Sequence, residues 1–202
     1  MSRVVLATRN PHKVVELQRI LDAVDGAGEL IGVDAFPNVP DVAETGLTFA
    51  ENAILKAVAV AASTGVPAVA DDSGLCVDVL GGMPGILSAR WCGRHGDDRA
   101  NLELVLAQLS DVADGNRAAH FACAAALALP SGHVEVVEGR LDGSLTRAPR
   151  GSNGFGYDPI FVPVGATRTT AELTPEDKDA ISHRGRALRA LAPRIRSAFN
   201  GA

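Results

Sequence analysis

The sequence is short of lysine, aromatic residues and cysteine, and it has no excess of positive charge. Of its 202 residues, 19 are Lys or Arg and 24 are Asp or Glu, which gives a net charge of −5. A protein whose main task is to bind a polyphosphate backbone usually carries the opposite excess, so nucleic acid is a poor candidate for the partner. A single phosphorylated metabolite needs only a local cluster of positive charge and stays open.

Cysteines and apolar runs are too few for a secreted or membrane protein. Cys76, Cys92 and Cys123 are odd in number and lack metal-ligand spacing, which favours free thiols and a cytoplasmic location. No apolar stretch reaches the roughly 18 residues that span a bilayer, and the first ten residues do not resemble a signal peptide. The hydrophobic fraction of 47% is enough for an ordinary core. We expect one domain over residues 1–202, with at most a small second lobe.

Strand and helix signals alternate along the chain and predict one α/β unit with a mixed sheet flanked by helices. Helix starts are expected at Asn10-Pro11, at the capping box Thr48 to Glu51, at Asp97, at Thr174-Pro175 and at Ser182. Gly26 and Gly28 are expected to end the first helix, and Gly65 the second. Strands are expected over residues 3–7, 30–33, 67–70, 75–80, 118–129, 133–141 and 160–162, with 118–129 and 133–141 forming an antiparallel hairpin.

A polar turn, Thr8-Arg9-Asn10-Pro11-His12-Lys13, joins the first expected strand to the first helix. Free amides at a helix start and the helix dipole favour an anion, and Lys13 adds a point charge, so this turn could bind a phosphate. The alternative is that Asn10 only caps the helix and Lys13 is solvated. The turn is not a Walker loop, because the chain has no G-x-x-x-x-G-K-[ST] motif.

Asp71 and Asp72 are adjacent carboxylates at the expected end of a strand. They would repel each other unless a cation or a shared proton is present, and Mg²⁺ is the natural candidate because it binds one or two carboxylates together with substrate phosphates and waters. A carboxylate beside such waters can act as a general base. One alternative is a turn in which one Asp caps backbone amides. Another is an aspartic-protease site, which is disfavoured because Asp72-Ser73-Gly74 has no second copy.

Lysine occurs only three times, at Lys13, Lys56 and Lys178. Genome composition alone would explain this usage. Arginine does not replace a compact ammonium at every phosphate, however, so the remaining lysines are candidates for phosphate contacts. Lys56 lies in the middle of an expected helix, where a solvated face is the alternative.

Two of the few aromatic residues, Phe155 and Tyr157, lie in the Gly-rich stretch Gly151–Asp158. They could form a stacking platform for a base, whose edge would be bound by Asp158 and by the downstream Ser182-His183-Arg184. The alternative is that both rings fill the core beneath a loop.

Taken together, these motifs resemble the inosine/xanthosine triphosphate pyrophosphatases over nearly the whole chain. The matching motifs are Thr8-x-Asn10-x-x-Lys13, Glu44-Thr45-Gly46-Leu47-Thr48-Phe49 with Glu51-Asn52-Ala53, Asp71-Asp72-Ser73-Gly74-Leu75, Gly81-Gly82-x-Pro84-Gly85, Phe155-Gly156-Tyr157-Asp158-Pro159 and Ser182-His183-Arg184. Several ordered motifs are far more specific than any one of them.

The resemblance implies an elongated, two-lobed α/β subunit of a homodimer, with the site in a cleft between the lobes. It implies hydrolysis of ITP, dITP and XTP to the monophosphate and pyrophosphate with Mg²⁺, with Asp72 as general base and metal ligand and Glu44 as a second metal ligand. The residues implied for substrate binding are Thr8, Arg9, Asn10, Pro11, His12 and Lys13 at the triphosphate, Ser73, Lys56 and Lys178 as further contacts, and Phe155, Gly156, Tyr157, Asp158, His183 and Arg184 around the base. Donors from Arg184 or backbone amides would favour a purine with a carbonyl at position 6.

Two positions depart from the family pattern. Arg9 stands where the family usually has Gly, so it either crowds the phosphates or points outward. Ala43 stands where an acid often precedes Glu44, which weakens the case for Glu44 as a ligand. Two other classes compete: a Maf-like or general nucleotide phosphatase, and a nucleotide-binding protein without turnover.

Overall fold

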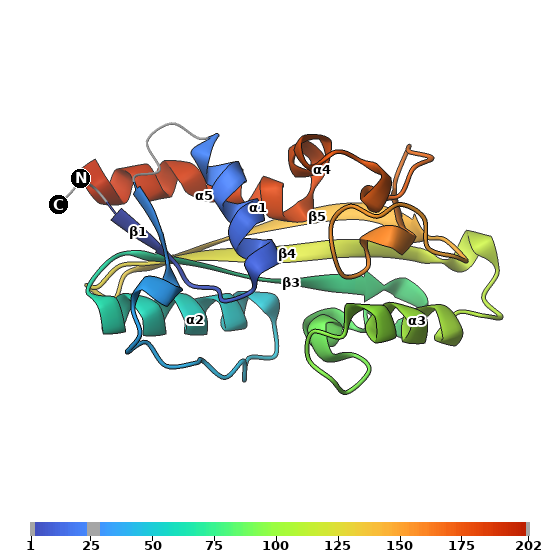
Figure 1. Ribbon diagram of the computed structural model, residues 1–202, viewed down its shortest axis with the longest axis horizontal. Helices are drawn as coiled ribbons and strands as arrows, with labels where there is room; N and C mark the ends of the chain where they lie inside the picture. The colour runs from blue at the N-terminus through green and yellow to red at the C-terminus, as the bar shows by residue number, and fades with distance from the viewer. Residues whose placement is uncertain (1–2, 24–28, 201–202) are drawn as a thin grey trace. The chain divides into compact units, whose positions relative to one another are not determined.

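The computed structural model describes residues 3–23 and 29–200 and has the α/β architecture that the sequence predicts. In this part of the chain a six-stranded mixed sheet, with strand order β2-β1-β3-β4-β5-β6, is flanked by helices (Figure 1). The strands are β1 (Arg3–Leu6), β2 (Glu29–Gly32), β3 (Ala68–Val77), β4 (Ala118–Ala128), β5 (Val134–Leu145) and β6 (Phe161–Pro163). The helices are α1 (Pro11–Asp22), α2 (Phe49–Thr64), α3 (Asp98–Gln108), α4 (Pro175–Ile181) and α5 (His183–Asn200). β1 pairs in parallel with β2 and β3, and β5 pairs antiparallel with β6.

The chain folds into two compact units. Unit 1 comprises residues 1–72, 123–139 and 183–202, and unit 2 comprises residues 73–122 and 140–182. Each of β3, β4 and β5 contributes residues to both units.

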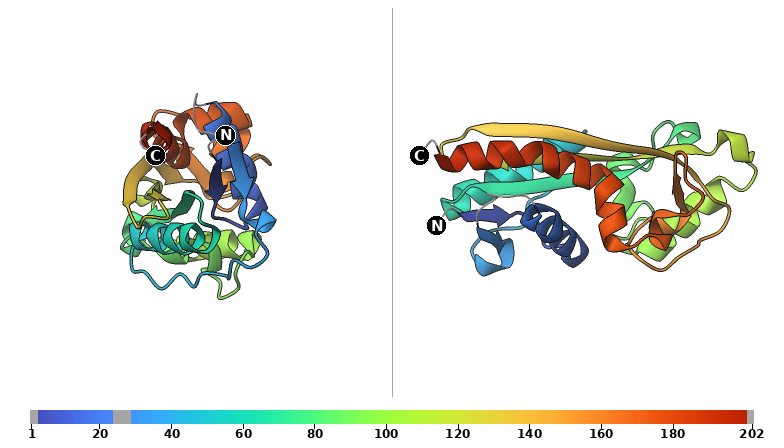
Figure 2. Two further views of the ribbon diagram at one scale, coloured as in Figure 1. Left: turned by 90° about the vertical axis from the view of Figure 1, so that its left-hand side faces the viewer. Right: turned by 90° about the horizontal axis from the view of Figure 1, so that it is seen from above.

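Unit 1 has three layers. Helix α2 packs on one face of its strands and α1 and α5 pack on the other, as the end-on view in Figure 2 shows. Small residues cover the α2 face, such as Ala53 and Ala57 of the helix against Ala124 and Ala126 of β4. Larger aliphatic side chains fill the opposite core, where Leu17 of α1 meets α5. In unit 2, α3 packs its apolar side on the strands in a third core.

The helices begin at or within one residue of the starts that the sequence predicts. Asn10 caps α1, Thr48 and Glu51 form the predicted capping box of α2, Asp97 caps α3 and Thr174 caps α4. The last helix begins at His183, one residue later than predicted. Gly65 ends α2 in the left-handed conformation, as expected, whereas Gly26 and Gly28 lie outside the described residues. Among the helices of the described residues, none combines the length and the apolar character needed to cross a membrane.

The prediction of a strand that stops before Asp71 is wrong. β3 continues from Ala68 to Val77, so both aspartates lie inside it. Asp and Gly are rare in strands, and this is why the pattern indicates a turn. Gly74 is required by packing instead, because a Cβ there would come within 2.3 Å of Ser88 Oγ.

Candidate active site

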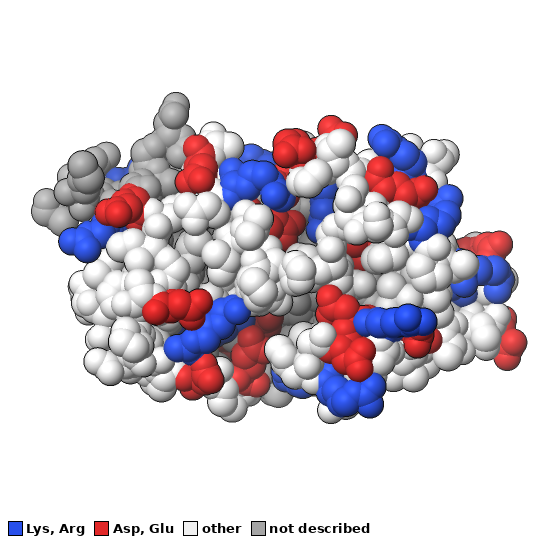
Figure 3. Space-filling view, in the orientation of Figure 1, with Lys and Arg blue, Asp and Glu red and all other residues white. Residues whose placement is uncertain are grey.

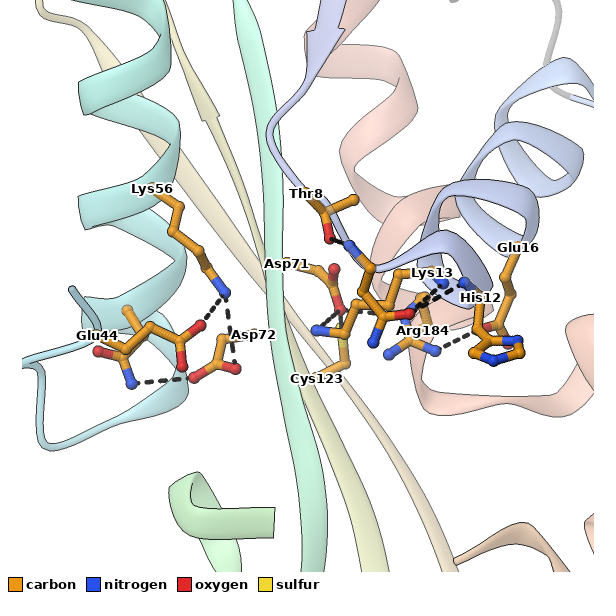
Figure 4. Close-up of polar contacts among 12 residues, drawn as sticks. Thr8, His12, Lys13, Glu16, Glu44, Lys56, Asp71, Asp72, Cys123 and Arg184 are labelled. Carbon is orange, nitrogen blue, oxygen red and sulfur yellow. Dashed lines mark hydrogen bonds and ion pairs between the residues drawn. The ribbon is translucent and has the colours of Figure 1, made fainter. Parts of the chain in front are cut away.

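Asp71 and Asp72 lie in unit 1 and have separate surroundings. Successive side chains of a strand point to opposite faces of the sheet, and Figure 4 shows the two carboxylates on opposite sides of β3. Asp71 contacts Lys13 and Arg184, whereas Asp72 contacts Asn52 and faces Lys56. Each carboxylate therefore has a lysine of its own nearby, Lys13 for Asp71 and Lys56 for Asp72.

The Asp71 side is a buried charge network. Asp71 Oδ2 lies 3.0 Å from Arg184 Nε and 3.1 Å from Lys13 Nζ, and Arg184 also pairs with Glu16 of α1. Burial alone would raise the pKa of Asp71, but Lys13 and Arg184 together hold it far below its usual range. Burial likewise raises the pKa of the neighbouring Cys123 thiol. Asp71 is therefore a permanent anion that fixes two cations.

On the Asp72 side the surroundings raise the pKa of the carboxyl group instead of lowering it. Lys56 Nζ of α2 lies 2.6 Å from Glu44 Oε1 and 3.8 Å from Asp72 Oδ1. Burial raises the pKa of Asp72, and Glu44 raises it further against the opposing charges of Lys56 and Lys13. Burial would lower the pKa of Lys56, but the nearby carboxylates, with Asp72 first, outweigh it and raise that pKa. A buried carboxylate with a raised pKa beside a lysine has the properties of a general base.

Asn52 orients Asp72 and was not among the predicted site residues. Its side chain is fully buried, its Nδ2 donates to Asp72 Oδ2 at 3.0 Å, and its Oδ1 accepts from the Gly46 amide at 2.8 Å. A Cβ at Gly46 would approach the same Oδ1 to 2.8 Å, so only glycine fits there. A signal was present in the sequence, because Asn52 and Lys56 are four residues apart and share one face of the helix.

In the turn before α1, Asn10 caps the helix as the alternative predicts, but Lys13 is not solvated: its side chain is 14% exposed and pairs with Asp71. Asn10 Oδ1 accepts from the amides of His12 and Lys13, and Thr8 Oγ1 accepts from the Asn10 amide. Pro11 occupies the first turn as predicted. Because these helix-start amides already have side-chain partners, the charge available to an anion comes from Lys13.

Arg9 lies at the surface, where its side chain is 41% exposed. Its guanidinium pairs with Asp41, lies 3.6 Å from Asp34 and donates to the Val39 carbonyl at 2.8 Å. On the face drawn in Figure 3, basic side chains lie among acidic ones and form no continuous basic surface. Arg9 therefore ties the turn to the 34–41 segment that leads toward Glu44.

The two aromatic residues of the Gly-rich stretch, Phe155 and Tyr157, lie in unit 2 and have different surroundings. Tyr157 is 5% exposed and donates through its hydroxyl to the Ser88 carbonyl at 2.8 Å, so it fills the core and cannot be a stacking platform. Phe155 is half-buried and lies below Lys178, whose Nζ is 5.1 Å from the ring centroid. Lys178 also pairs with the buried Asp158 at 2.7 Å.

The remaining predicted residues fall in both units. Ser73 follows Asp72 on β3 and is half-buried. His183 is buried at the start of α5 in unit 1, where its carbonyl would lie 2.1 Å from a Cβ at Gly139. The structure thus brings Lys13, Glu44, Lys56, Asp72 and Arg184 together in unit 1, and Phe155, Gly156, Asp158 and Lys178 together in unit 2.

No group of three or more His, Cys, Asp or Glu side chains in residues 3–23 and 29–200 is placed to hold a metal ion. The carboxylates of Glu44 and Asp72 both lie near the Lys56 ammonium, at 2.6 and 3.8 Å. The three cysteines are free thiols, as predicted.

Comparison with known proteins agrees with the geometry. The sequence model of the Ham1 family matches residues 4–194. The dITP/XTP pyrophosphatase of Streptomyces avermitilis is 65% identical over 97% of this chain and 98% of its own, and that of Mycobacteroides abscessus is 56% identical over 98% and 97%. Among solved structures, the nucleoside-triphosphatase of Mycobacterium abscessus has a TM-score of 0.76 at 57% identity and covers 95% of this chain and 99% of that one. A HAM1 protein from Coxiella burnetii has a TM-score of 0.85 at 42% identity, with both chains fully covered.

Proposed function

Because the chain belongs to the Ham1 family, we propose that it hydrolyses the triphosphates of nonstandard purine nucleosides, dITP, ITP and XTP, to the monophosphate and pyrophosphate. Its relatives named dITP/XTP pyrophosphatase are similar along their whole length, so the proposal extends to the whole chain. The reaction attacks a phosphoric anhydride with water and removes unwanted nucleotides from the pool.

The observation that carries this proposal is the pair of environments around β3. Asp72, buried and with a raised pKa, serves as the general base that takes a proton from the attacking water. Lys13 and Lys56 stabilise the negative charge that develops on the triphosphate. Asp71 pairs with the Lys13 ammonium at 3.1 Å and holds it in place.

The donor set of Glu44 and Asp72 fits Mg²⁺. Hard divalent cations bind oxygen, and Mg²⁺ in nucleotide sites takes one or two carboxylates and completes its shell with phosphates and water. The Lys56 ammonium already lies near both carboxylates, so these side chains hold positive charge at this place. When bound by Glu44 and Asp72, Mg²⁺ would neutralise phosphate charge and lower the pKa of water.

The base is bound by residues of unit 2. Phe155 stacks on the purine, and the Lys178 ammonium donates to the carbonyl at position 6 of hypoxanthine or xanthine. Adenine has an amino group at that position and would leave the donor unpaired, which disfavours ATP. Arg184 would act mainly through Asp71 and Glu16, to which it is bound. We place this activity in the cytoplasm, on free nucleotides, in a homodimer.

Product analysis tests the function. ITP, XTP, GTP and ATP are each incubated with the protein with and without Mg²⁺, and pyrophosphate is separated from orthophosphate. Pyrophosphate and monophosphate from ITP and XTP, only with Mg²⁺, is the expected result, and Asp72→Asn should abolish it. Orthophosphate from all four nucleotides would indicate a general phosphatase, and binding without turnover would indicate a nucleotide-binding protein.

A further inference from the structure

The turn that carries Phe155 is fixed by its own side chains. Asp158 Oδ2 accepts from the Phe155 amide at 2.9 Å, and the Asp158 amide donates to the Phe155 carbonyl at 3.3 Å. A Cβ at Gly154 would come within 2.2 Å of Asp158 Oδ2. Thr170 and Lys178 hold the same carboxylate. The Phe155 backbone is therefore anchored on one side.

The other side of this turn is anchored by a residue far away in the sequence. The peptide between Phe155 and Gly156 donates its N–H to Asp98 Oδ2 at 2.9 Å, while its carbonyl accepts from the Asp158 amide. Gly156 has a φ of 60°, a region that glycine enters freely. Because Gly156 has no Cβ, its own conformational preference does not fix the orientation of this peptide. The bond from the N–H to Asp98, shorter than the 3.3 Å bond at the carbonyl, holds the N–H end of this peptide.

Asp98 lies on a rigid support within unit 2. It is the first residue of α3, whose N-cap Asp97 accepts from the Ala100 amide at 3.1 Å. One turn later, the buried Asn101 accepts from the Cys92 amide at 2.7 Å. The carboxylate of Asp98 is thus held by a helix that is itself fixed at its start.

We propose that Asp98 is a positioning residue for base recognition, because it fixes the Phe155–Gly156 peptide and with it the Phe155 ring below Lys178. This inference rests on the proposed function, in which Phe155 stacks on the purine. Asp98 bonds to Gly156 within unit 2, whereas the proposed triphosphate residues belong to unit 1, so its loss should weaken binding of the base and leave the chemical step unchanged.

Three variants separate this role from a structural one. Asp98→Ala removes the acceptor and the charge, and Asp98→Asn removes the charge but keeps an acceptor oxygen. Both lose the same favourable interaction with the α3 dipole, so their difference isolates the hydrogen bond to Gly156. Arg99→Ala alters the adjacent exposed residue, whose ion pair is with Glu103 one turn along α3, and serves as control.

For Asp98→Ala we expect the KM for ITP to rise about tenfold, as for loss of a hydrogen bond to a charged group, with kcat nearly unchanged. The ratio of kcat/KM for ITP over ATP should fall. Inhibition by inorganic pyrophosphate, which has no base, should stay at the wild-type level. Asp98→Asn should recover most of the wild-type KM, and Arg99→Ala should equal the wild type.

The proposal is overturned if Asp98→Ala keeps the wild-type KM, if Asp98→Asn is as impaired as Asp98→Ala, or if pyrophosphate inhibition weakens in parallel. A fall in kcat with unchanged KM and a lower melting temperature would show a structural role instead. Tyr157→Phe, which removes the hydroxyl bonded to the Ser88 carbonyl, tests the same turn independently and should raise the KM in the same direction. Wild-type protein that fails to hydrolyse ITP would refute the proposed function, and the effect of Asp98 would then be measured by titrating IMP into the same variants.

Discussion

Replacing each of the two adjacent aspartates by asparagine should change the stability of the protein in opposite directions. A carboxyl whose pKa is lower in the folded than in the unfolded chain stabilises the fold at every pH above its unfolded pKa. Asp71 is such a group, because Lys13 and Arg184 outweigh the effect of burial. Its stabilisation is complete at neutral pH and is lost only as the pH falls below its ordinary value of 3.8.

Ionisation of Asp72 has the opposite effect on the stability of the fold. Its pKa is raised by burial and by Glu44, so the folded protein binds the proton more tightly than the unfolded chain does. The ionised form destabilises the fold at neutral pH, and this penalty disappears as the pH falls through the raised pKa toward 3.8. An uncharged asparagine avoids the penalty and can still accept from Asn52.

The magnitudes follow from burial. Asp71→Asn leaves the buried Arg184 and Lys13 without their shared anion, and breaking a buried ion pair from one side costs about 3–5 kcal/mol. Asp72→Asn should stabilise the fold by on the order of 1 kcal/mol, because removing a buried charge that function requires commonly raises stability. Asp142→Asn is the matched control, since Asp142 is exposed and its pair with Arg140 should contribute less than about 1 kcal/mol.

Urea unfolding at pH 7.5 in EDTA, followed by far-ultraviolet circular dichroism, measures all three variants against the wild type. The deficit of Asp71→Asn should persist down to about pH 4, whereas the gain of Asp72→Asn should shrink on acidification. Both variants should lose activity, so activity alone does not separate them. A shift of the same sign in both variants would refute the assignment of a permanent anion to one face of β3 and a base to the other.

Three further variants test other parts of unit 1. Asn52→Leu should keep its far-ultraviolet spectrum but lose kcat by roughly 100-fold with little change in KM, because Asp72 is no longer oriented; steady-state kinetics with ITP checks this. Lys13→Arg keeps the charge but replaces a compact ammonium, and should lower kcat/KM at least about tenfold; wild-type activity would contradict the phosphate role. Gly139→Ala places a Cβ against the His183 carbonyl and should cost about 1–3 kcal/mol of stability, measured by urea unfolding, without changing KM.

Local features of the fold could be predicted from the sequence, and long-range ones could not. The starts of α2 and α3 depend on side chains within three residues, such as Thr48 with Glu51, so they were predictable. Within β3, the buried charge of Asp71 is compensated by Lys13 and Arg184, which are distant in sequence, so no local pattern indicates it.

In the candidate site, too, residue types could be predicted from the sequence but long-range contacts could not. Asp72 and Lys56 were predicted, and the structure places them 3.8 Å apart. The sequence does not decide whether Tyr157 is buried, because its hydroxyl donates to an acceptor 69 residues away, the Ser88 carbonyl. Phe155 and Tyr157 are equivalent in a sequence pattern, and only the packing around them separates their roles.

The alternation of β3 explains why one site uses two adjacent acids. Asp71 faces the layer of α1 and α5, from which Lys13 and Arg184 come, and Asp72 faces α2, from which Asn52 and Lys56 come. A phosphate that approaches Lys13 competes with Asp71 for its ammonium.

In the proposed function, a phosphate that binds Lys13 leaves Asp71 paired with Arg184, so the carboxylate keeps a partner in the interior. Glu16, on the other side of Arg184, keeps that guanidinium paired as well. The buried network therefore holds Lys13 ready for an anion without the large cost of abandoning a buried charge. In the proposed function both lysines contact the triphosphate, Lys13 from the side of Asp71 and Lys56 from the side of Asp72, the proposed base.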